Sequence, residues 1–231
     1  MLLLSIDTST RGCSVAVHAD SVLLSNYDLN TDKSSSSMLT TLIKNAVEQA
    51  GYGLNDLDAV AVAKGPGSYT GLRVGVSTAK GLCYALDKPL IAINTLEAMS
   101  LQVIPFFSKD TLFCSMIDAR RMEVYASVFD FENNSILETK AIIMDEHSFE
   151  DLLHNNKIVF FGDGAEKCKK LLSANENAIF LNEEIRPSAK TVGQLALKFF
   201  TESHFENLVT FEPYYLKDFM TPPSRKAALA V

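Results

Sequence analysis

Short apolar runs and amphipathic stretches alternate along the first hundred residues of the chain. Apolar runs of roughly four to eight residues between turn residues are typical of buried strands, whereas apolar residues recurring every three to four positions are typical of helices. These patterns predict strands at 2–6, 13–18, 22–29, 58–63 and 90–93, and helices at 35–50, 70–86 and 95–101. Three strands followed by alternating helices and strands favour an α/β fold in which helices cover a mixed sheet.

The same pattern returns, more weakly, in the second half of the chain. Beyond a break near Pro105 it predicts strands at 112–117, 123–130, 138–144, 158–161 and 178–181, and helices at 148–153, 165–172 and 188–200. The segments IDTSTRGCSVAV (6–17) and IDARRMEVYASV (117–128) share a strand, an aspartate, a turn and a returning strand, which indicates an internal repeat. We therefore expect two similar subdomains, 1–100 and a smaller one at 101–220, followed by a poorly ordered tail at 221–231.

A glycine-rich loop, KGPGSYTGLRVGVSTAKGL (64–82), joins the predicted strand at 58–63 to the next helix. Gly65, Gly67 and Gly71 permit backbone conformations barred to other residues, and Ser68 or Thr70 can cap the helix. Free N–H groups at such a helix start can hold a phosphate, but the loop can equally be a tight turn. Both interpretations stay open. A Walker loop is excluded because no GK[ST] follows the glycines, and a dinucleotide-binding loop fits poorly because the third glycine comes one place late.

The predicted helix after this loop carries small residues at a spacing of four. Gly71, Gly75 and Ala79 share one face, although an interior glycine costs a helix about 1 kcal/mol relative to alanine. A close approach of another backbone would explain them, supplied either by the chain's own sheet or by a partner helix. The helix at 35–50 has an apolar stripe of its own and a plausible C-cap at Gly51.

Composition narrows the classes of function. The chain has 231 residues, 47% of them apolar, a formal net charge of −7 and a sequence pI of about 5.1, so no bulk electrostatic field favours nucleic acid. No apolar run approaches the roughly 18 residues of a membrane span, and the N-terminal run turns polar too soon for a signal peptide, so we expect a cytoplasmic protein without a membrane partner. Four cysteines without a CxxC pair are expected to be reduced core residues: Cys13, Cys83, Cys114 and Cys168.

Asp7 and Asp118 end the first strands of the two repeats. With the glycine loops they could form a nucleotide cleft between the halves, in which both carboxylates face each other as ligands of a hydrated metal ion. Alternatively, each aspartate only caps a hairpin turn. The residues of this candidate cleft are Asp7, Thr8, Gly65, Gly67, Ser68, Asp118, Gly162 and Gly164. The four histidines are scattered, and no nucleophile, base and orienting acid come together in the sequence, so no catalytic residue is assigned.

Three stretches of the first hundred residues closely resemble one protein family. They are LLLSIDTST, DAVAVAKGPGSYTGLRVGVSTAKGL and KPLIAINTLEAMS, and the second half matches more loosely through IDARRMEVYAS, FFGDGAEKC and PYYLK. The family is TsaB (YeaZ), a bacterial partner protein in the making of threonylcarbamoyladenosine on tRNA, and GPGSYTGLRVG is nearly diagnostic of it. The resemblance implies an actin-like ATPase (ribonuclease H-like) fold with two similar subdomains. It also implies a non-catalytic dimerisation subunit, which pairs with and activates the larger catalytic relative TsaD for threonylcarbamoyl transfer to the adenosine next to the anticodon.

The resemblance has a consequence for metal binding. In the catalytic relative, the strand after the glycine-loop helix runs into two histidines of an HLEGH-type motif that bind the active-site metal. Here Thr95 and Met99 occupy those two places. A hydroxyl and a thioether cannot replace two imidazoles at such a site, so we expect this chain to bind no metal there and to catalyse no carbamoyl transfer itself.

The resemblance also implies partners. In this family the helices matching 35–50 and 70–86 contact TsaD, or a second copy of the chain when TsaD is absent. The ATPase TsaE and tRNA join through the complex, and ATP or ADP is expected, if anywhere, at its interface. The implied interface residues are Met38, Leu39, Leu42, Ile43, Ala46, Gly71, Val74, Gly75, Thr78, Ala79 and Leu82. The main alternative is an actin-fold ATPase or sugar-kinase-like enzyme acting on its own. A glycoprotease-like peptidase is weaker, because the histidines and a nucleophile motif are missing.

Overall fold

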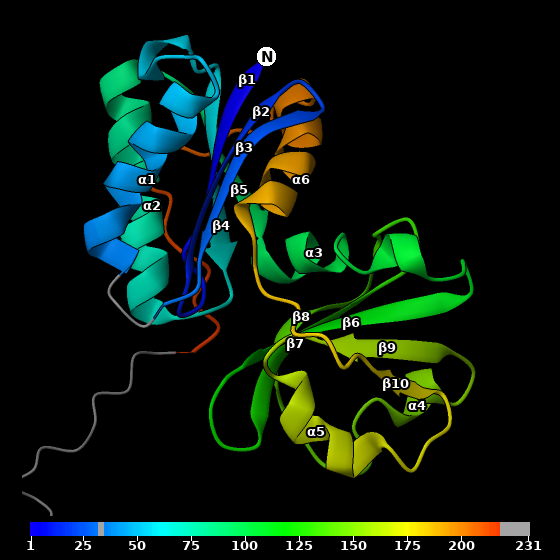
Figure 1. Ribbon diagram of the computed structural model, residues 1–231. Coiled ribbons are helices and arrows are strands. Elements are labelled where there is room, and N and C mark those ends of the chain that lie inside the picture. The colour runs from blue at the N-terminus through cyan, green and yellow to red at the C-terminus, as the bar shows by residue number, and fades with distance from the viewer. Residues whose placement is uncertain (32–34, 218–231) are drawn as a thin grey trace, which may run out of the picture.

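The chain forms two halves, each built on a five-stranded sheet, and Figure 1 shows them one above the other. The computed structural model describes residues 1–31 and 35–217, without the side chains of residues 35–37. The tail expected at 221–231 lies outside the described residues. Within them, no helix has the length and apolar character needed to cross a membrane.

The first sheet contains the predicted meander and the strand before the glycine loop. Its strands are β1 (Leu2–Asp7), β2 (Cys13–Ala19), β3 (Val22–Leu29), β4 (Ala59–Gly65) and β5 (Leu90–Asn94), in the order β3-β2-β1-β4-β5. The strands of the meander are antiparallel, whereas β4 and β5 run parallel to β1. β1 and β4 are almost entirely buried, because both faces of the sheet are covered.

Helices α1 (Ser35–Gln49) and α2 (Tyr69–Leu86) lie side by side on one face of this sheet (Figure 1). A short 3₁₀ helix, η1 (Leu54–Asp56), follows α1. The C-cap prediction is confirmed: Gly51 has a φ of 87°, its N–H donates to Glu48 O (3.0 Å), and Tyr52 N–H donates to Val47 O (3.1 Å). Ser68 is the N-cap of α2, and its Oγ accepts a hydrogen bond from Gly71 N (3.3 Å).

The second sheet repeats the connectivity of the first. Its strands are β6 (Thr111–Asp118), β7 (Glu123–Phe129), β8 (Ser135–Ile143), β9 (Lys157–Phe161) and β10 (Ala178–Phe180), in the order β10-β9-β6-β7-β8. β6, β7 and β8 form an antiparallel meander, and β9 and β10 run parallel to β6. Three antiparallel strands extended by two parallel ones form a ribonuclease H-like sheet. Its duplication confirms the predicted repeat and the actin-like fold.

Helix α3 (Thr95–Ser100) lies between the two sheets (Figure 1). Its residues Leu96 and Met99 pack with Phe113 and Ile117 of β6, next to the short 3₁₀ helix η2 (Ile104–Phe106). Helix α5 (Ala165–Leu172) packs on the second sheet. The four cysteines are buried and free, as predicted.

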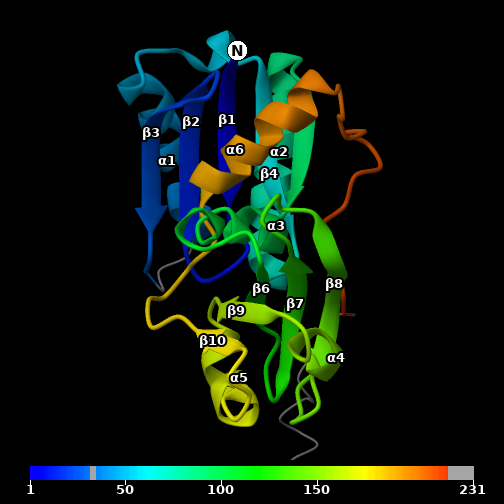
Figure 2. The ribbon, with the colours of Figure 1, turned by 90° about the vertical axis from the view of Figure 1, so that its right-hand side faces the viewer.

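Helix α6 (Ala189–Thr201) comes late in the sequence but covers the open face of the first sheet, which it crosses diagonally in Figure 2. Its buried residues Val192 and Ala196 pack with Leu3, Ala61 and Ile91. The expected subdomain at 101–220 is therefore wrong for α6. Without this helix, the apolar side chains on that face of the sheet would remain in water.

Residues 211–217, which we call the C-terminal strap, join the two halves. Tyr214 N donates to Lys64 O (2.7 Å) of β4, and Tyr214 Oη donates to Thr139 O (3.3 Å) of β8. The ring of the next residue, Tyr215, stacks on Tyr69 at the start of α2, with centroids 4.7 Å apart. The strap therefore touches the glycine loop, α2 and the second sheet.

One predicted helix begins two residues later than expected. α4 covers only Glu150–Leu153 instead of 148–153. Phe149 has a φ of 65°, and Ser148 Oγ accepts a hydrogen bond from Asp145 N (3.0 Å), so these residues form a turn before the helix. A serine that binds nearby backbone groups favours a turn over a helix interior.

Candidate functional site

The glycine loop packs against the turn that follows β1. A Cβ atom at Gly67 would lie 2.2 Å from Ser9 O, and Ser68 N donates a hydrogen bond to the same oxygen (2.6 Å). Gly65 has a φ of 116°, and a Cβ there would lie 2.9 Å from Tyr214 O of the strap. The loop is thus held by the chain itself, and a tight turn accounts for its glycines without a bound anion.

Gly71 and Gly75 of α2 pack directly against Thr8. A Cβ at Gly71 would lie 2.0 Å from Thr8 O, and one at Gly75 would lie 2.3 Å from Thr8 Oγ1, which itself donates to Gly71 O (2.7 Å). Ala79, on the same face, is fully buried in the core between α1, α2 and the first sheet. The small residues of α2 therefore serve close packing within the chain.

A second glycine loop repeats this arrangement in the other half. Gly162 has a φ of 96°, and a Cβ there would lie 2.1 Å from Met116 O, while one at Gly164 would lie 2.9 Å from Ile117 C. The loop between β9 and α5 thus packs on the end of β6, as the loop between β4 and α2 packs on the turn after β1.

Asp7 is buried at the end of β1 with one satisfied oxygen. Its Oδ1 accepts hydrogen bonds from Ser9 N (2.8 Å) and Ser9 Oγ (2.6 Å), but its Oδ2 has no hydrogen-bond partner. Burial raises the pKa of Asp7 to about 6 against the opposing effect of the Ser9 bonds, and the charge of Asp28 raises it further. Asp7 and Asp28 both line a polar cavity of about 10 Å³, the space of roughly one water molecule.

Asp118 has the opposite environment. It is exposed at the end of β6, where it pairs with Lys167 and its Oδ1 accepts from Arg120 N (2.8 Å). Partial burial alone would raise the pKa of Asp118, but the Lys167 hydrogen bond, the Arg120 N–H and the charges of both side chains outweigh it and lower that pKa.

These environments do not fit the prediction that Asp7 and Asp118 face each other as ligands of one hydrated metal ion. The carboxylate of Asp118 is neutralised by Lys167, and the charge acting on Asp7 comes from Asp28. The cavity that Asp7 lines includes none of the other cleft residues, Thr8, Gly65, Gly67, Ser68, Asp118, Gly162 or Gly164. Each aspartate instead accepts a backbone N–H two residues further on, which is the turn-capping alternative.

Thr95 and Met99 are fully buried in α3, at 0% exposure each. Asn94 is the N-cap of this helix and accepts hydrogen bonds from Leu96 N (2.9 Å) and Glu97 N (3.3 Å). Thr95 Oγ1 has no partner, and the methyl group of Met99 faces Gly162 of the second half. Met99 therefore belongs to the contact between α3 and the second sheet, and Thr95 is buried at the start of the same helix.

Most of the implied interface residues face inward, which corrects their assignment. Leu39, Leu42, Ile43, Ala46, Gly75 and Ala79 are buried in the chain's own core. Gly71 is half-buried, but its face is filled by Thr8. Met38 is 40% exposed, and Val74, Thr78 and Leu82 are half-buried, so these four retain surface for a partner.

The outer face of α2 contains a residue that the interface prediction missed. Gly81 is exposed, and a Cβ placed on it would meet nothing within 4 Å. The sequence contains this glycine, but only the structure shows that no contact with the described residues, 1–31 and 35–217, requires it. The strap is a second feature beyond sequence reasoning, since PYYLK reveals neither Lys64 nor Thr139 as its partners.

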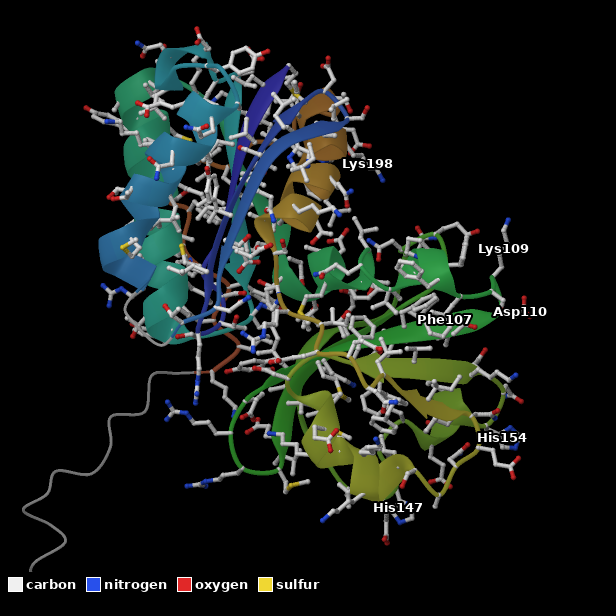
Figure 3. The ribbon with its side chains drawn as sticks, viewed as in Figure 1. Phe107, Lys109, Asp110, His147, His154 and Lys198 are labelled. Carbon is white, nitrogen blue, oxygen red and sulfur yellow. The ribbon has the colours of Figure 1, made fainter. Side chains whose placement is uncertain are left out.

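The histidines do not gather. His147 and His154 lie apart on the outer part of the second half, far from the glycine loop (Figure 3). His18 is buried at 1% exposure beneath α6, where a Cβ at Gly193 would lie 2.4 Å from its ring. In residues 1–31 and 35–217, no three His, Cys, Asp or Glu side chains are grouped as metal ligands.

Comparisons with known proteins agree with this architecture. The family model described as "TsaD: tRNA N6-adenosine threonylcarbamoyltransferase" matches residues 23–229. The tRNA threonylcarbamoyladenosine biosynthesis protein TsaB of Escherichia coli (strain K12) is 28% identical over 222 residues, covering 94% of this chain and 95% of that protein. TsaB of Bacillus subtilis (strain 168) is 33% identical over 133 residues, 58% of this chain and 57% of that protein.

A solved structure shares the fold. YeaZ from Pseudomonas aeruginosa superposes with a TM-score of 0.79 at 23% identity, covering 93% of this chain and 99% of that chain. Together with the match over residues 23–229, this shows that the chain belongs to the TsaD (tRNA N6-adenosine threonylcarbamoyltransferase) family and is, within it, a relative of TsaB (YeaZ).

Proposed function

We infer that the chain is a non-catalytic subunit in tRNA threonylcarbamoyladenosine biosynthesis, which pairs with and activates a TsaD-type transferase. Relatives that match nearly its whole length are named as TsaB biosynthesis proteins, whereas the family as a whole is described by its transferase. We base the non-catalytic role on the positions at which this chain differs from the transferase TsaD.

The observation that carries this proposal is the burial of Thr95 and Met99. By resemblance these positions correspond to the two metal-binding histidines of TsaD. Here a hydroxyl and a thioether replace the imidazoles, both side chains are fully buried, and Met99 packs in the contact of α3 with the second sheet. A catalytic metal needs strong nitrogen or oxygen ligands and an open coordination position, whereas Met99 offers only a thioether, Thr95 only a neutral hydroxyl, and both are buried.

The outer layer of α1 and α2 is the surface we propose for TsaD, or for a second copy when TsaD is absent. The two helices have 15 and 18 residues and lie side by side (Figure 1). Met38 projects from this layer, and Val74, Thr78 and Leu82 border it. An exposed Gly81 costs α2 about 1 kcal/mol without any internal contact to require it. Close approach of a partner helix at Gly81 supplies the missing reason.

The test is size-exclusion chromatography with light scattering on the chain alone and mixed with its cognate TsaD. We expect a homodimer alone and a one-to-one complex in the mixture. Gly81→Leu should leave the chain folded, since Gly81 is exposed and a Cβ placed there would meet nothing within 4 Å, but should weaken the complex by at least about tenfold. Gln194→Leu places the same residue on an exposed position of α6, across the sheet, and should leave binding unchanged.

Other outcomes separate the rival functions. Independent elution of the two wild-type proteins, with and without ATP, would contradict the pairing. Unchanged binding by Gly81→Leu would move the interface away from this part of α2. Turnover of ATP by the isolated chain would favour an actin-fold ATPase. Within the proposed function, TsaE and tRNA join through the complex, and ATP or ADP binds at its interface.

A further inference from the structure

The turn between β6 and β7 carries two arginines in an unusual backbone conformation. Arg120 and Arg121 have φ angles of 69° and 50°, a region that few residues other than glycine, asparagine and aspartate adopt. A strained turn of this kind persists only where the surrounding structure holds it in place. We call residues 118–123 the arginine turn.

Two lysines from distant parts of the chain hold this turn. Lys167 of α5 donates to Arg121 O (2.8 Å) and Glu123 O (2.6 Å) and pairs with Asp118. Lys217, at the end of the strap, pairs with the carboxylate of Glu123. The backbone of the turn is therefore fixed from both sides before any ligand binds.

Each of the two lysines is paired with a carboxylate, so the remaining positive charge of the turn is that of the two arginines. Lys167 is neutralised by Asp118, and Lys217 by Glu123. Arg120 and Arg121 are exposed, and within residues 1–31 and 35–217 neither guanidinium makes a hydrogen bond or an ion pair. The turn thus presents two exposed guanidinium groups to solvent, of which Arg120 also acts on the Asp118 carboxylate through its charge.

The start of the equivalent turn in the first half of the chain is buried, so the fold does not require the arginine turn to be exposed. In the first half, the turn after β1 is covered by the glycine loop, and Thr8 and Ser9 are 1% and 0% exposed. In the second half, Gly162 and Gly164 contact the end of β6, from Met116 to Asp118, and leave the arginine turn uncovered.

The arginine turn lies close to the helix layer proposed as the partner surface. Tyr215 stacks on Tyr69 in the first turn of α2, and Lys217, two residues later, reaches the arginine turn. Two residues of extended chain span at most about 7 Å. The arginine turn therefore lies near the start of α2, at one end of the surface proposed for TsaD.

We propose that the arginine turn binds the phosphate backbone of the tRNA held by the complex. This inference rests on the proposed function. The planar guanidinium fork matches phosphate oxygens, and a preformed turn loses little conformational entropy on binding. Because the whole chain carries a net charge of −7, its contribution to tRNA binding is confined to such a local contact.

The experiment measures binding of a labelled tRNA transcript to the complex of this chain with TsaD, by fluorescence anisotropy between about 50 and about 300 mM KCl. The double variant Arg120→Gln, Arg121→Gln should bind about tenfold more weakly at low salt. The slope of log affinity against log salt should fall by about 0.7–0.9 for each arginine removed, because fewer counterions are released. Arg120→Lys, Arg121→Lys keeps both charges and should restore most of the slope.

Arg186→Gln is the matched control, because that exposed arginine is already paired with Glu184 and should not affect tRNA binding. Light scattering with TsaD, without tRNA, is measured in parallel on every variant. Unchanged tRNA affinity and slope in an intact complex would overturn the inference and leave the proposed function standing. Loss of TsaD binding by the glutamine variant would overturn it in favour of a protein contact.

A third readout separates the two sources of phosphate. Calorimetry of ATP binding to the isolated chain should be unaffected by the glutamine variant. If that variant lost ATP binding while tRNA affinity was unchanged, the turn would hold a free nucleotide and the inference would fail. Absence of any complex between the wild-type chain and TsaD would instead contradict the proposed function.

Discussion

At the scale of single residues, Asp7 is the group whose chemistry departs furthest from what its sequence context suggests. It follows a buried strand and was expected to face a cleft, but it is 3% exposed, with Oδ2 unpartnered and Asp28 nearby. The ordinary pKa of 3.8 rises to about 6 in the folded chain, because burial disfavours the carboxylate. Ionisation of Asp7 therefore costs folding stability.

Asp7→Asn should stabilise the protein above pH 6. Because the folded-state pKa lies above the unfolded one, stability falls as the pH rises from about 4 to about 6 and stays lower beyond that. The amide keeps an oxygen for both Ser9 bonds and removes the charge, so the gain is about 3 kcal/mol at neutral pH and small near pH 4. Urea unfolding at both pH values measures it.

Two controls isolate the effect. Asp110→Asn changes an exposed carboxyl group, labelled in Figure 3, and should shift stability little at either pH. The pKa of buried His18 is lowered by burial and by the charge of Lys190, so acid destabilises wild type and variant alike and cancels in their difference. A variant that loses stability at neutral pH would show that the charge of Asp7 is compensated.

At the scale of elements, α2 shows that glycines in one helix can have different causes. Gly75 is buried against Thr8 Oγ1, whereas Gly81 is exposed without a neighbour within 4 Å. The sequence places both in the same helical segment and does not distinguish them, because the contact of Gly75 comes from a residue more than sixty positions earlier.

The pair Gly75→Ala and Gly81→Ala should therefore have opposite effects on the free energy of unfolding. A Cβ at position 75 would meet Thr8 Oγ1 at 2.3 Å, and this overpacking should cost about 1–3 kcal/mol. Alanine at position 81 has room and raises helix propensity, so it should add up to about 1 kcal/mol. Thermal unfolding of the two variants tests this. Destabilisation by both would mean that Gly81 also has a contact within the chain.

Element boundaries were largely predictable, because each depends on local chemistry. The extent of β3 and α5 agrees with the hydrophobic pattern at both ends, and Ser68 and Gly51 cap their helices as expected. The exceptions are β8, which begins at Ser135 instead of 138, and α4, where the turn at Phe149 overrides a helical pattern of only six residues. Short amphipathic segments have little intrinsic stability, so tertiary contacts decide them.

At the scale of the whole molecule, two segments from the end of the chain complete the first half, and one of them also joins it to the second. α6 covers the open face of the first sheet, and the strap runs from α2 to the second sheet. Lys80 Nζ also donates to Phe211 O (2.8 Å) at the start of the strap. The strap therefore begins in the core of the first half, where Phe211 is buried, and ends on the second half.

Tyr215→Ala should loosen this strap. Loss of the ring stack with Tyr69 should lower the free energy of unfolding by about 1 kcal/mol and speed hydrogen exchange in residues 211–217. Tyr84→Ala is the matched control, because Tyr84 lies on α2, as Tyr69 does, but is 84% exposed. Its removal should change stability by less than about 0.5 kcal/mol. Equal effects of the two substitutions would contradict a structural role for the stack.

The sequence by itself determined the class of fold, the repeat, the order of the elements and the family. These depend on apolar periodicity, capping residues and short motifs, which are properties of short stretches of sequence and do not require knowledge of tertiary contacts. Only the tertiary structure decided which residues are available to a ligand. Gly71 and Gly75 pack against Thr8, Met99 packs on the second sheet, and Arg120 and Arg121 are exposed. Exposure depends on contacts between distant segments, and these arise only when the sheets and their covering helices come together.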